Sequence, residues 1–238
     1  MMTGVDSESR IPMAPHTIDR VSFFSRIQAF FQSSRTPEVS EVPGHTDLPE
    51  ARWLVVGLGN PGAKYESTRH NVGYMCVDTL LDRRTDNAAP PLAPVRGLKV
   101  LTAPLPDAAE RALAVRSTTF MNHSGQGVAP LAEKLGIPPE RIIVIHDELD
   151  LPAGKVRLKK GGNENGHNGL KSLTQELGTR DYLRVRIGIS RPPTGMNVPD
   201  YVLAPVTEQQ PGIDVAADAV DLTIARGLAA AQNEIHSR

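Results

Sequence analysis

Short apolar runs alternate with amphipathic stretches from residue 52 onward, and Gly or Pro stands at many of the joints. Residues 52–56 have the apolar pattern of a strand. Residues 72–83 repeat apolar side chains at helical spacing and predict the helix that follows. Strands alternating with helices through short connections are typical of an α/β domain. Further strands are predicted at 98–103 paired with 112–116, at 141–146, at 155–160 and at 183–190, and further helices at 124–135, 168–177 and 216–235.

The first 50 residues have a different pattern. They are rich in Ser, Thr, Pro, Asp and Glu and show little periodicity, which predicts a largely disordered extension. The exception is VSFFSRIQAFF at 21–31, whose apolar positions predict a short amphipathic helix holding four of the five phenylalanines. Docking onto a domain or a partner is favoured over membrane contact, because few basic residues accompany it. Residues 51–238 are the predicted folded domain.

Composition narrows the class of protein. A chain of 238 residues with 39% hydrophobic residues can bury one substantial core. The single cysteine, Cys76, excludes an internal disulfide and fits a reducing compartment. Neither a membrane-spanning apolar stretch nor a secretory signal is found. We therefore expect a soluble, cytoplasmic protein.

Charge is segregated along the chain although the formal net charge is only −1. Residues 155–191 carry nine basic and three acidic side chains, a net charge of +6, whereas both ends of the chain are acidic. Such a basic band fits either an ordinary solvated surface or a surface that binds a polyanion over a limited area.

The segment WLVVGLGNPG contains Gly57, Gly59 and Gly62 in the spacing of a dinucleotide fingerprint. A dinucleotide site needs a helix that begins within the glycine loop. Here the helical pattern begins only near Asn71, and Pro61 removes an N–H that would face a phosphate. We therefore reject a nucleotide site. The loop instead presents a polar side chain, Asn60, at the end of a strand, where α/β proteins place their sites.

His70 and Asp147 are the candidate proton-transfer pair. Histidine is best suited to move protons near neutral pH, although a single histidine more often has a capping or packing role. Asp147 follows the predicted strand 141–146 and could accept the N–H of the imidazole, which fixes its tautomer. Asp150, close behind it, could merely cap a turn.

Amide side chains occur at two predicted helix starts. Asn122 and Asn168 could donate to a carbonyl or a developing oxyanion, or each could be an N-cap. No nucleophile elbow is present, and Cys76 lies in an apolar helical pattern, so water is the expected nucleophile. A metal held by His70 and Asp147 with His146 or His167 is a weaker interpretation, because no compact ligand spacing is found.

Several segments together closely resemble the bacterial-type peptidyl-tRNA hydrolase family. They occur in the family's order and spread over residues 53–203. The segments are VVGLGNPGAKYESTRHNVGY, TTFMNHSG, IIVIHDELDLPAGKVRLKKGG, GHNGLKS, RVRIGISRPP and DYVL. The resemblance implies one three-layer α/β domain with a twisted mixed sheet between helices, a metal-free monomer without cofactor, and cleavage of the ester between a peptidyl group and the tRNA 3′ ribose.

The resemblance also implies roles for individual residues. His70 becomes the general base, and Asp147 the carboxylate that holds it. Asn60 resembles the residue that distinguishes N-blocked peptidyl esters from free aminoacyl esters. The remaining positions match those that bind the peptidyl-adenosine end (Tyr65, Phe120, Asn122, Asn168) or clamp a tRNA phosphate (Lys159, Arg186). No membrane and no obligate protein partner are implied.

Some positions depart from the family pattern. Ser117 stands where proline is usual, which should loosen that loop. The segment Asn163-Glu164-Asn165 replaces small residues, and Glu164 would place a negative charge near a nucleic-acid path. A non-catalytic RNA-binding relative and a metal-dependent phosphodiesterase are the competing hypotheses. The enzyme is favoured because Asn60, His70, Asn122, Asp147 and Asn168 are all present.

Overall fold

The computed structural model describes residues 48–238 with gaps at 85–90, 107 and 207–209. The predicted extension over residues 1–50 lies outside the described residues except for 48–50, and the predicted helix near 21–31 lies outside them entirely. Within the described ranges, no helix is both long enough and apolar enough to cross a membrane.

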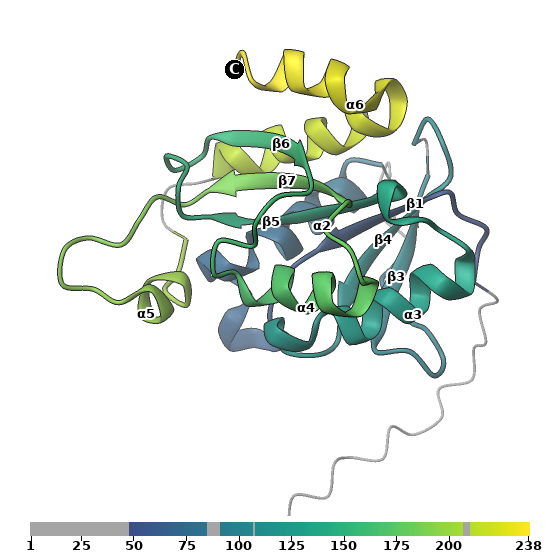
Figure 1. The fold of residues 1–238 in the computed structure, drawn as a ribbon, viewed down its shortest axis with the longest axis horizontal. Helices are drawn as coiled ribbons and strands as arrows, with labels where there is room; N and C mark the ends of the chain where they lie inside the picture. The colour runs from purple at the N-terminus through teal and green to yellow at the C-terminus, as the bar shows by residue number, and fades with distance from the viewer. Residues whose placement is uncertain (1–47, 85–90, 107, 207–209) are drawn as a thin grey trace, which may run out of the picture. The chain divides into compact units, whose positions relative to one another are not determined.

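A mixed β-sheet forms the middle layer of the domain (Figure 1). Among the described residues it has seven strands in the order β2-β3-β4-β1-β5-β7-β6. Strands β4, β1, β5 and β7 run parallel, and β2, β3 and β6 join antiparallel at the two sides. The strands are β1 (Trp53–Gly57), β2 (Ala93–Pro94), β3 (Val100–Leu105), β4 (Ala112–Ser117), β5 (Ile142–Glu148), β6 (Val156–Lys160) and β7 (Leu183–Gly188).

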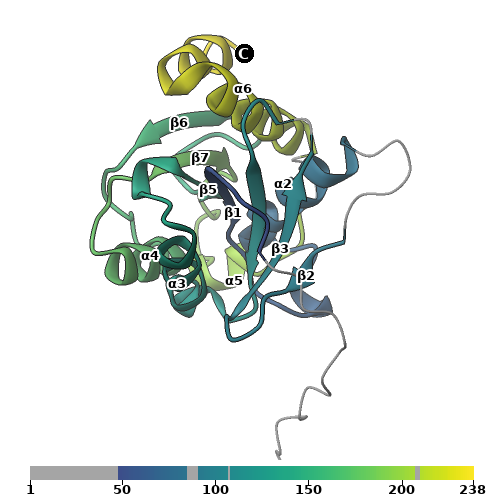
Figure 2. The same ribbon diagram turned by 90° about the vertical axis from the view of Figure 1, so that its right-hand side faces the viewer.

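Helices cover both faces of the sheet, as Figure 2 shows. They are α2 (Val72–Asp82), α3 (Gly125–Leu135), α4 (Asn168–Leu177), α5 (Val198–Val202) and α6 (Gln210–Ile235), with 3-10 turns η1 (Ala63–Tyr65), η2 (Arg69–Asn71), η3 (Met121–His123) and η4 (Pro139–Arg141). Side chains alternate across a strand, so Val55 packs with α2 and α6 whereas Leu54 packs with α3 and α4. The central strands are therefore apolar on both faces.

Gly57 and Gly73 let α2 approach the sheet closely. A Cβ atom at Gly73 would lie 2.4 Å from the carbonyl oxygen of Ile145, and one at Gly57 would lie 2.4 Å from the carbonyl oxygen of Gly73. Gly57 of the apparent fingerprint is thus needed for packing. Helix α2 begins at Val72, well beyond the end of β1, which agrees with the rejection of a dinucleotide site.

Side chains from the end of the chain cover the outer edge of β6. The backbone N–H of Leu158 donates to Nε2 of His236 at 2.9 Å, and its carbonyl accepts from Nε2 of Gln232 at 3.0 Å. Burial lowers the pKa of His236, and nearby cations, Arg157 foremost, lower it further, so the neutral ring can accept. The edge strand therefore has its exposed backbone groups at Leu158 satisfied.

The structure confirms the predicted strands and helices, with ends shifted by a few residues. Besides the 3-10 turns, it adds a strand and a helix that the pattern did not predict, β2 (Ala93–Pro94) and α5 (Val198–Val202). Elements of two and five residues are too short to show a period. The predicted C-terminal helix is also interrupted, because Gly227 has φ 80° and ψ 166° inside α6.

Candidate active site

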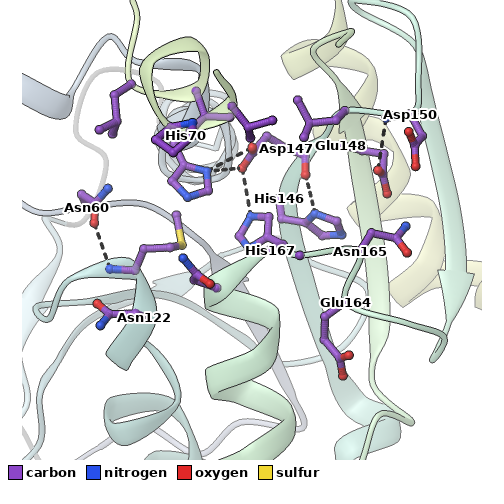
Figure 3. A pocket seen from close by; sticks show the side chains of 18 of the residues that line it. Asn60, His70, Asn122, His146, Asp147, Glu148, Asp150, Glu164, Asn165 and His167 are labelled. Carbon is purple, nitrogen blue, oxygen red and sulfur yellow. Dashed lines mark hydrogen bonds and ion pairs between the residues drawn. The ribbon is translucent and has the colours of Figure 1, made fainter. Parts of the chain in front are cut away.

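The carboxyl ends of the parallel strands bring the candidate residues to one cavity. The loop after β1 carries Asn60, the turn η3 after β4 carries Asn122, and the end of β5 carries Asp147. The cavity has a volume of about 570 Å³, and His70, His167 and Asn168 also line it. Figure 3 shows Asn60 and Asn122 on one side of it, with Glu148, Asp150 and Asn165 on the other.

His70 and Asp147 are in direct contact, as predicted. Nδ1 of His70 lies 2.9 Å and 3.0 Å from the two carboxylate oxygens of Asp147 (Figure 3). The His70 side chain is 13% exposed and that of Asp147 only 3%. Because the carboxylate accepts, Nδ1 carries the proton and Nε2 is left as the basic nitrogen.

The two groups shift each other's pKa in opposite directions. Burial alone would lower the pKa of His70, but the charge and hydrogen bond of Asp147 outweigh it, so the pKa is raised. Burial would raise the pKa of Asp147, but His70 and His167 hold it well below its ordinary value. The pair thus combines an ionised carboxylate with a strengthened imidazole base.

His167 is the residue whose role the sequence did not indicate. Its Nε2 lies 3.0 Å from Oδ1 of Asp147, while its Nδ1 accepts the backbone N–H groups of Gly169 at 3.1 Å and Leu170 at 3.4 Å. His167 is therefore the N-cap of α4 and, at the same time, a donor to the carboxylate. Ser, Thr, Asp and Asn are the usual caps, so no common sequence signal marks this residue.

His146 is buried behind the pair, and its side chain contacts the backbone of Asp147 instead of the carboxylate. Its Nδ1 donates to the backbone carbonyl of Asp147 at 2.7 Å, and burial holds the pKa of the ring well below its ordinary value. The ring stacks edge-on against His167, with centroids 5.1 Å apart. His146 is thus a neutral core histidine beside the site.

His70, Asp147 and His167 could offer ligand atoms within 4.8 Å of one another. The protonation pattern argues against a metal there. Nδ1 of His167 accepts two N–H groups, so Nε2 must carry the proton of the neutral ring and has no lone pair for a metal. Nδ1 of His70 likewise carries the proton that Asp147 accepts. The three residues fit a hydrogen-bonded triad better than a metal centre.

Asn60 is fixed by three hydrogen bonds that leave its amide nitrogen available. Its Oδ1 accepts the backbone N–H of Met121 at 2.9 Å, which orients the amide. Its backbone N–H and carbonyl bond to Oδ1 and Nδ2 of Asn71, at 2.8 Å and 2.9 Å. Asn60 is only 8% exposed yet lines the cavity, so the group that it presents is the Nδ2 donor.

Asn122 and Asn168 both line the cavity, and neither is an N-cap. Asn122 lies within η3, whose N-cap is Phe120, and its Nδ2 contacts Nε2 of His123 at 3.1 Å. Asn168 is the first residue of α4, which His167 caps. The alternative of simple capping therefore does not apply to these two asparagines.

Tyr65 and Phe120 form an aromatic pair outside the cavity lining. Their rings meet edge to face with centroids 6.3 Å apart, and Phe120 is 55% exposed. Nζ of Lys64 lies 4.8 Å from the centroid of the Tyr65 ring. Phe120 is the sequence neighbour of Met121, whose backbone N–H donates to Oδ1 of Asn60. The aromatic pair therefore adjoins the site along the chain.

Lys159 and Arg186 lie on the antiparallel strands β6 and β7, and neither is among the residues that line the cavity. Lys159 stands opposite Arg184 in the β6–β7 register, and Arg186 is two residues further along β7. Burial lowers the pKa of Lys159, and the charges of Arg186 and Arg184 lower it further. Arg186 also approaches Glu148, at 3.5 Å, which lines the cavity. The two predicted phosphate contacts are thus near neighbours.

Two cations of the basic band have partners within the domain. Arg184 is only 1% exposed and donates to the carbonyls of Gly162 and Asn163, both at 2.8 Å. Arg180 donates from Nε to Glu164 at 2.7 Å. Burial would raise the pKa of Glu164, but hydrogen bonds from Arg180 and Thr174 lower it to about 2. The negative charge expected at Glu164 is therefore paired with a cation.

The other departures from the family pattern also have structural partners. Asn165 has φ 48°, a left-handed conformation that Asn tolerates better than most residues, and it lines the cavity. The hydroxyl of Ser117 lies 2.7 Å from that of Thr119 and accepts its N–H at 3.2 Å. Whether Ser117 loosens the loop stays a prediction.

Sequence comparisons identify relatives of this chain. A sequence profile described as peptidyl-tRNA hydrolase matches residues 54–238. A protein of Corynebacterium glutamicum named peptidyl-tRNA hydrolase 2 is 72% identical over 218 residues, which cover 92% of this chain and 98% of the relative. A protein of the same name from Corynebacterium jeikeium is 48% identical over 197 residues, covering 78% and 80% of the two chains.

Solved structures agree with the sequence comparison. The crystal structure of peptidyl-tRNA hydrolase from Acinetobacter baumannii has a TM-score of 0.69 and 32% identity, and covers 80% of this chain and 96% of its own. A mutant of that enzyme has a TM-score of 0.70, with 34% identity over 80% of this chain and 97% of its own.

Fold and site define an α/β protein with a buried histidine-carboxylate pair at the carboxyl end of the parallel strands of a mixed sheet. The profile match and the 72% identical relative then give the family. The chain belongs to the peptidyl-tRNA hydrolase family, as the sequence motifs predict.

Proposed function

We propose that this chain hydrolyses the ester between a peptidyl group and the 3′ ribose of tRNA, with water activated by His70. The observation that carries the proposal is the contact of His70 Nδ1 with both oxygens of Asp147, which leaves Nε2 as the base beside the cavity. Family membership supports the substrate class.

The proposed reaction needs no covalent intermediate with the protein. Nε2 of His70 takes a proton from water, and the resulting hydroxide attacks the ester carbonyl. The ribose oxygen then leaves and takes the proton back from the imidazolium. Asp147 holds the ring in the right tautomer and stabilises the imidazolium while it exists. Cys76 is not a competing nucleophile, because it is buried and burial raises the pKa of its thiol.

Amide donors around the cavity suit the rest of the substrate. The Nδ2 group of Asn60 is a fixed donor for a carbonyl of the peptidyl group, which an N-blocked substrate provides. Asn122 and Asn168 offer further donors to the ester oxygen, where negative charge develops in the transition state. Preorganised donors of this kind stabilise an oxyanion without reorganising during the reaction.

The peptidyl part and the tRNA part of the substrate would contact different surfaces of the protein. Leu149 and three side chains at α5, Val198, Val202 and Leu203, form an apolar wall of the cavity that suits a peptidyl side chain. The exposed Phe120, with Tyr65, suits the terminal adenosine by stacking. Lys159 and Arg186 suit a tRNA phosphate.

The family also supports a cytoplasmic enzyme that acts as a monomer without an obligate protein partner or cofactor, with residues 51–238 as the catalytic domain. The alternative, a non-catalytic RNA-binding relative, has no observation in its favour, because the base, its carboxylate and the amides of the site are all in place.

Release of the N-acetyl-aminoacyl group from N-acetyl-aminoacyl-tRNA tests the proposal. We expect multiple turnovers that are unchanged by a chelator. Binding of tRNA without release would support the RNA-binding alternative. Loss of activity on chelation, restored by a divalent metal, would support the metal-dependent one. A variant that begins at Ala51 should retain the activity.

A further inference from the structure

Arg69, the residue before His70, contacts helix α5 in the wall of the cavity. The backbone N–H of Arg69 donates to the carbonyl of Ala204 at 3.1 Å, just beyond α5. Its guanidinium lies 4.4 Å from the centroid of the Tyr201 ring and donates to the Tyr201 carbonyl at 3.4 Å. Arg69 thus contacts α5 through both its backbone and its side chain.

The two residues before Arg69 also contact the segment that follows α5. Thr68 forms an antiparallel bridge with Pro205, and the N–H of Val206 donates to the carbonyl of Ser67 at 2.7 Å. Residues 67–69 and 204–206 therefore form a short two-stranded connection. A displacement of α5 has to be followed by the turn η2 or has to break these hydrogen bonds.

His70 lies between two anchored neighbours. Arg69 is held by α5, whereas Asn71 is held by the backbone of Asn60 at 2.8 Å and 2.9 Å. The first anchor belongs to the wall of the cavity, and the second belongs to the loop after β1. The position of the His70 imidazole relative to the substrate therefore depends on the contacts of both neighbours.

Helix α5 is also the part of the wall that a ligand can bury further. Val198 is 41% exposed and Leu203 is 42% exposed, although both are apolar and both line the cavity. The helix is only five residues long, and Figure 1 shows it at the end of the long loop that leaves β7. Contact of an apolar group with these side chains removes apolar surface from water and favours a shift of α5 toward it.

We propose that Arg69 is a positioning residue for His70, which transmits the contact between an apolar peptidyl side chain and α5 to the imidazole. This inference rests on the proposed function, since it needs a peptidyl ester as the substrate. It makes the rate of the chemical step depend on the peptidyl group, and it does so without any contact between Arg69 and the substrate.

The test compares two substrates on one tRNA, acylated with N-acetyl-leucyl-leucine or with N-acetyl-glycyl-glycine. For the unaltered protein we expect a higher kcat with the dileucyl substrate. Arg69→Met should lower kcat on that substrate roughly tenfold, because a small displacement of the base is costly, and should bring the ratio of the two kcat values to about one. Arg69→Lys, which keeps a cation over the Tyr201 ring, should retain much of the ratio.

Leu203→Ser is a second variant on an exposed residue, so the fold is not at risk. It should reduce the dileucyl kcat several-fold more than the diglycyl kcat. Arg226→Met, which removes an exposed guanidinium paired with Glu234, is the matched control and should leave both values unchanged.

Equal kcat values for the two substrates in the unaltered protein would overturn the inference. So would a loss in Arg69→Met that is equal for both substrates, since that is the result of a merely structural role. An effect of Leu203→Ser on KM alone would also overturn it. If the unaltered protein releases neither peptide, the proposed function itself fails, which is a different outcome.

Discussion

His167 donates from Nε2 to Oδ1 of Asp147 at 3.0 Å, the same oxygen that lies 2.9 Å from Nδ1 of His70. Two imidazoles therefore hold one buried carboxylate, and only His70 has its second ring nitrogen unused. The other ring nitrogen of His167 is occupied by two backbone N–H groups of α4. His167 thus links the start of a helix to the base.

Replacement of His167 separates its two roles. His167→Asn keeps an oxygen that can cap α4 but is too short to reach Asp147, so we expect a lower kcat with an unchanged melting temperature. His167→Ala loses both contacts, and loss of the cap should cost about 1 kcal/mol of stability in addition. Thermal melting and single-turnover rates measure the two effects. Equal melting temperatures for the two variants would contradict the capping role.

Replacement of His70 should remove catalysis and spare binding. His70→Ala lacks the base, so we expect kcat to fall on the order of 10²- to 10⁴-fold, the usual contribution of a general base. The dissociation constant for deacylated tRNA should not change, because the imidazole acts on water. Turnover at the unaltered rate would exclude His70 as the base.

Replacement of Asp147 should move the pH dependence. The neutral form of His70 is the active one, so activity falls as the pH drops through its pKa, which Asp147 raises above the ordinary value. In Asp147→Asn this effect is lost while burial still lowers the pKa. The acid limb of kcat/KM should therefore shift to lower pH, with a reduced plateau at high pH. An unshifted limb would show that Asp147 does not control the base.

Replacement of Asn60 tests the proposed recognition of the N-blocked group. Asn60→Asp keeps an oxygen that accepts from Met121 but replaces the Nδ2 donor with a second acceptor. The loss of one buried hydrogen bond should cost about 1–3 kcal/mol of transition-state stabilisation. The comparison is kcat/KM for N-acetyl-aminoacyl-tRNA against free aminoacyl-tRNA. A proportional loss on both substrates would mean that Asn60 does not discriminate between them.

Replacement of Lys159 or Arg186 should change the salt dependence of binding. Each lost phosphate contact lowers the slope of log K against log salt concentration by about one. Arg83→Ala is a suitable control, because Arg83 is the C-cap of α2 and is paired with Asp214 and Asp218. Filter binding of deacylated tRNA at several salt concentrations gives the slopes. Equal slopes for Lys159→Ala and the control would place the RNA elsewhere.

The sequence predicted the parallel core and its residues well, because β1 and β5 are continuous apolar runs and polar residues mark where they end. Asn60 and Asp147 could be found in this way, and the contact of Asp147 with His70 followed from the strand end. The role of His167 could not, since its ring replaces a usual capping side chain and its partner lies 20 residues away. Charge counts also overstated the free charge of the basic band, since Arg184 is buried on backbone carbonyls and Arg180 is paired with Glu164.

The side chains of Gln232 and His236 occupy the outer edge of β6 at Leu158. An edge strand with free backbone groups is a template onto which a second chain can add a strand. Because the pKa of His236 is lowered, its ring stays an acceptor at neutral pH and this template stays closed. The strand that carries Lys159 is therefore protected against β-type self-association by two side chains, and protonation of His236 in acid removes one of them.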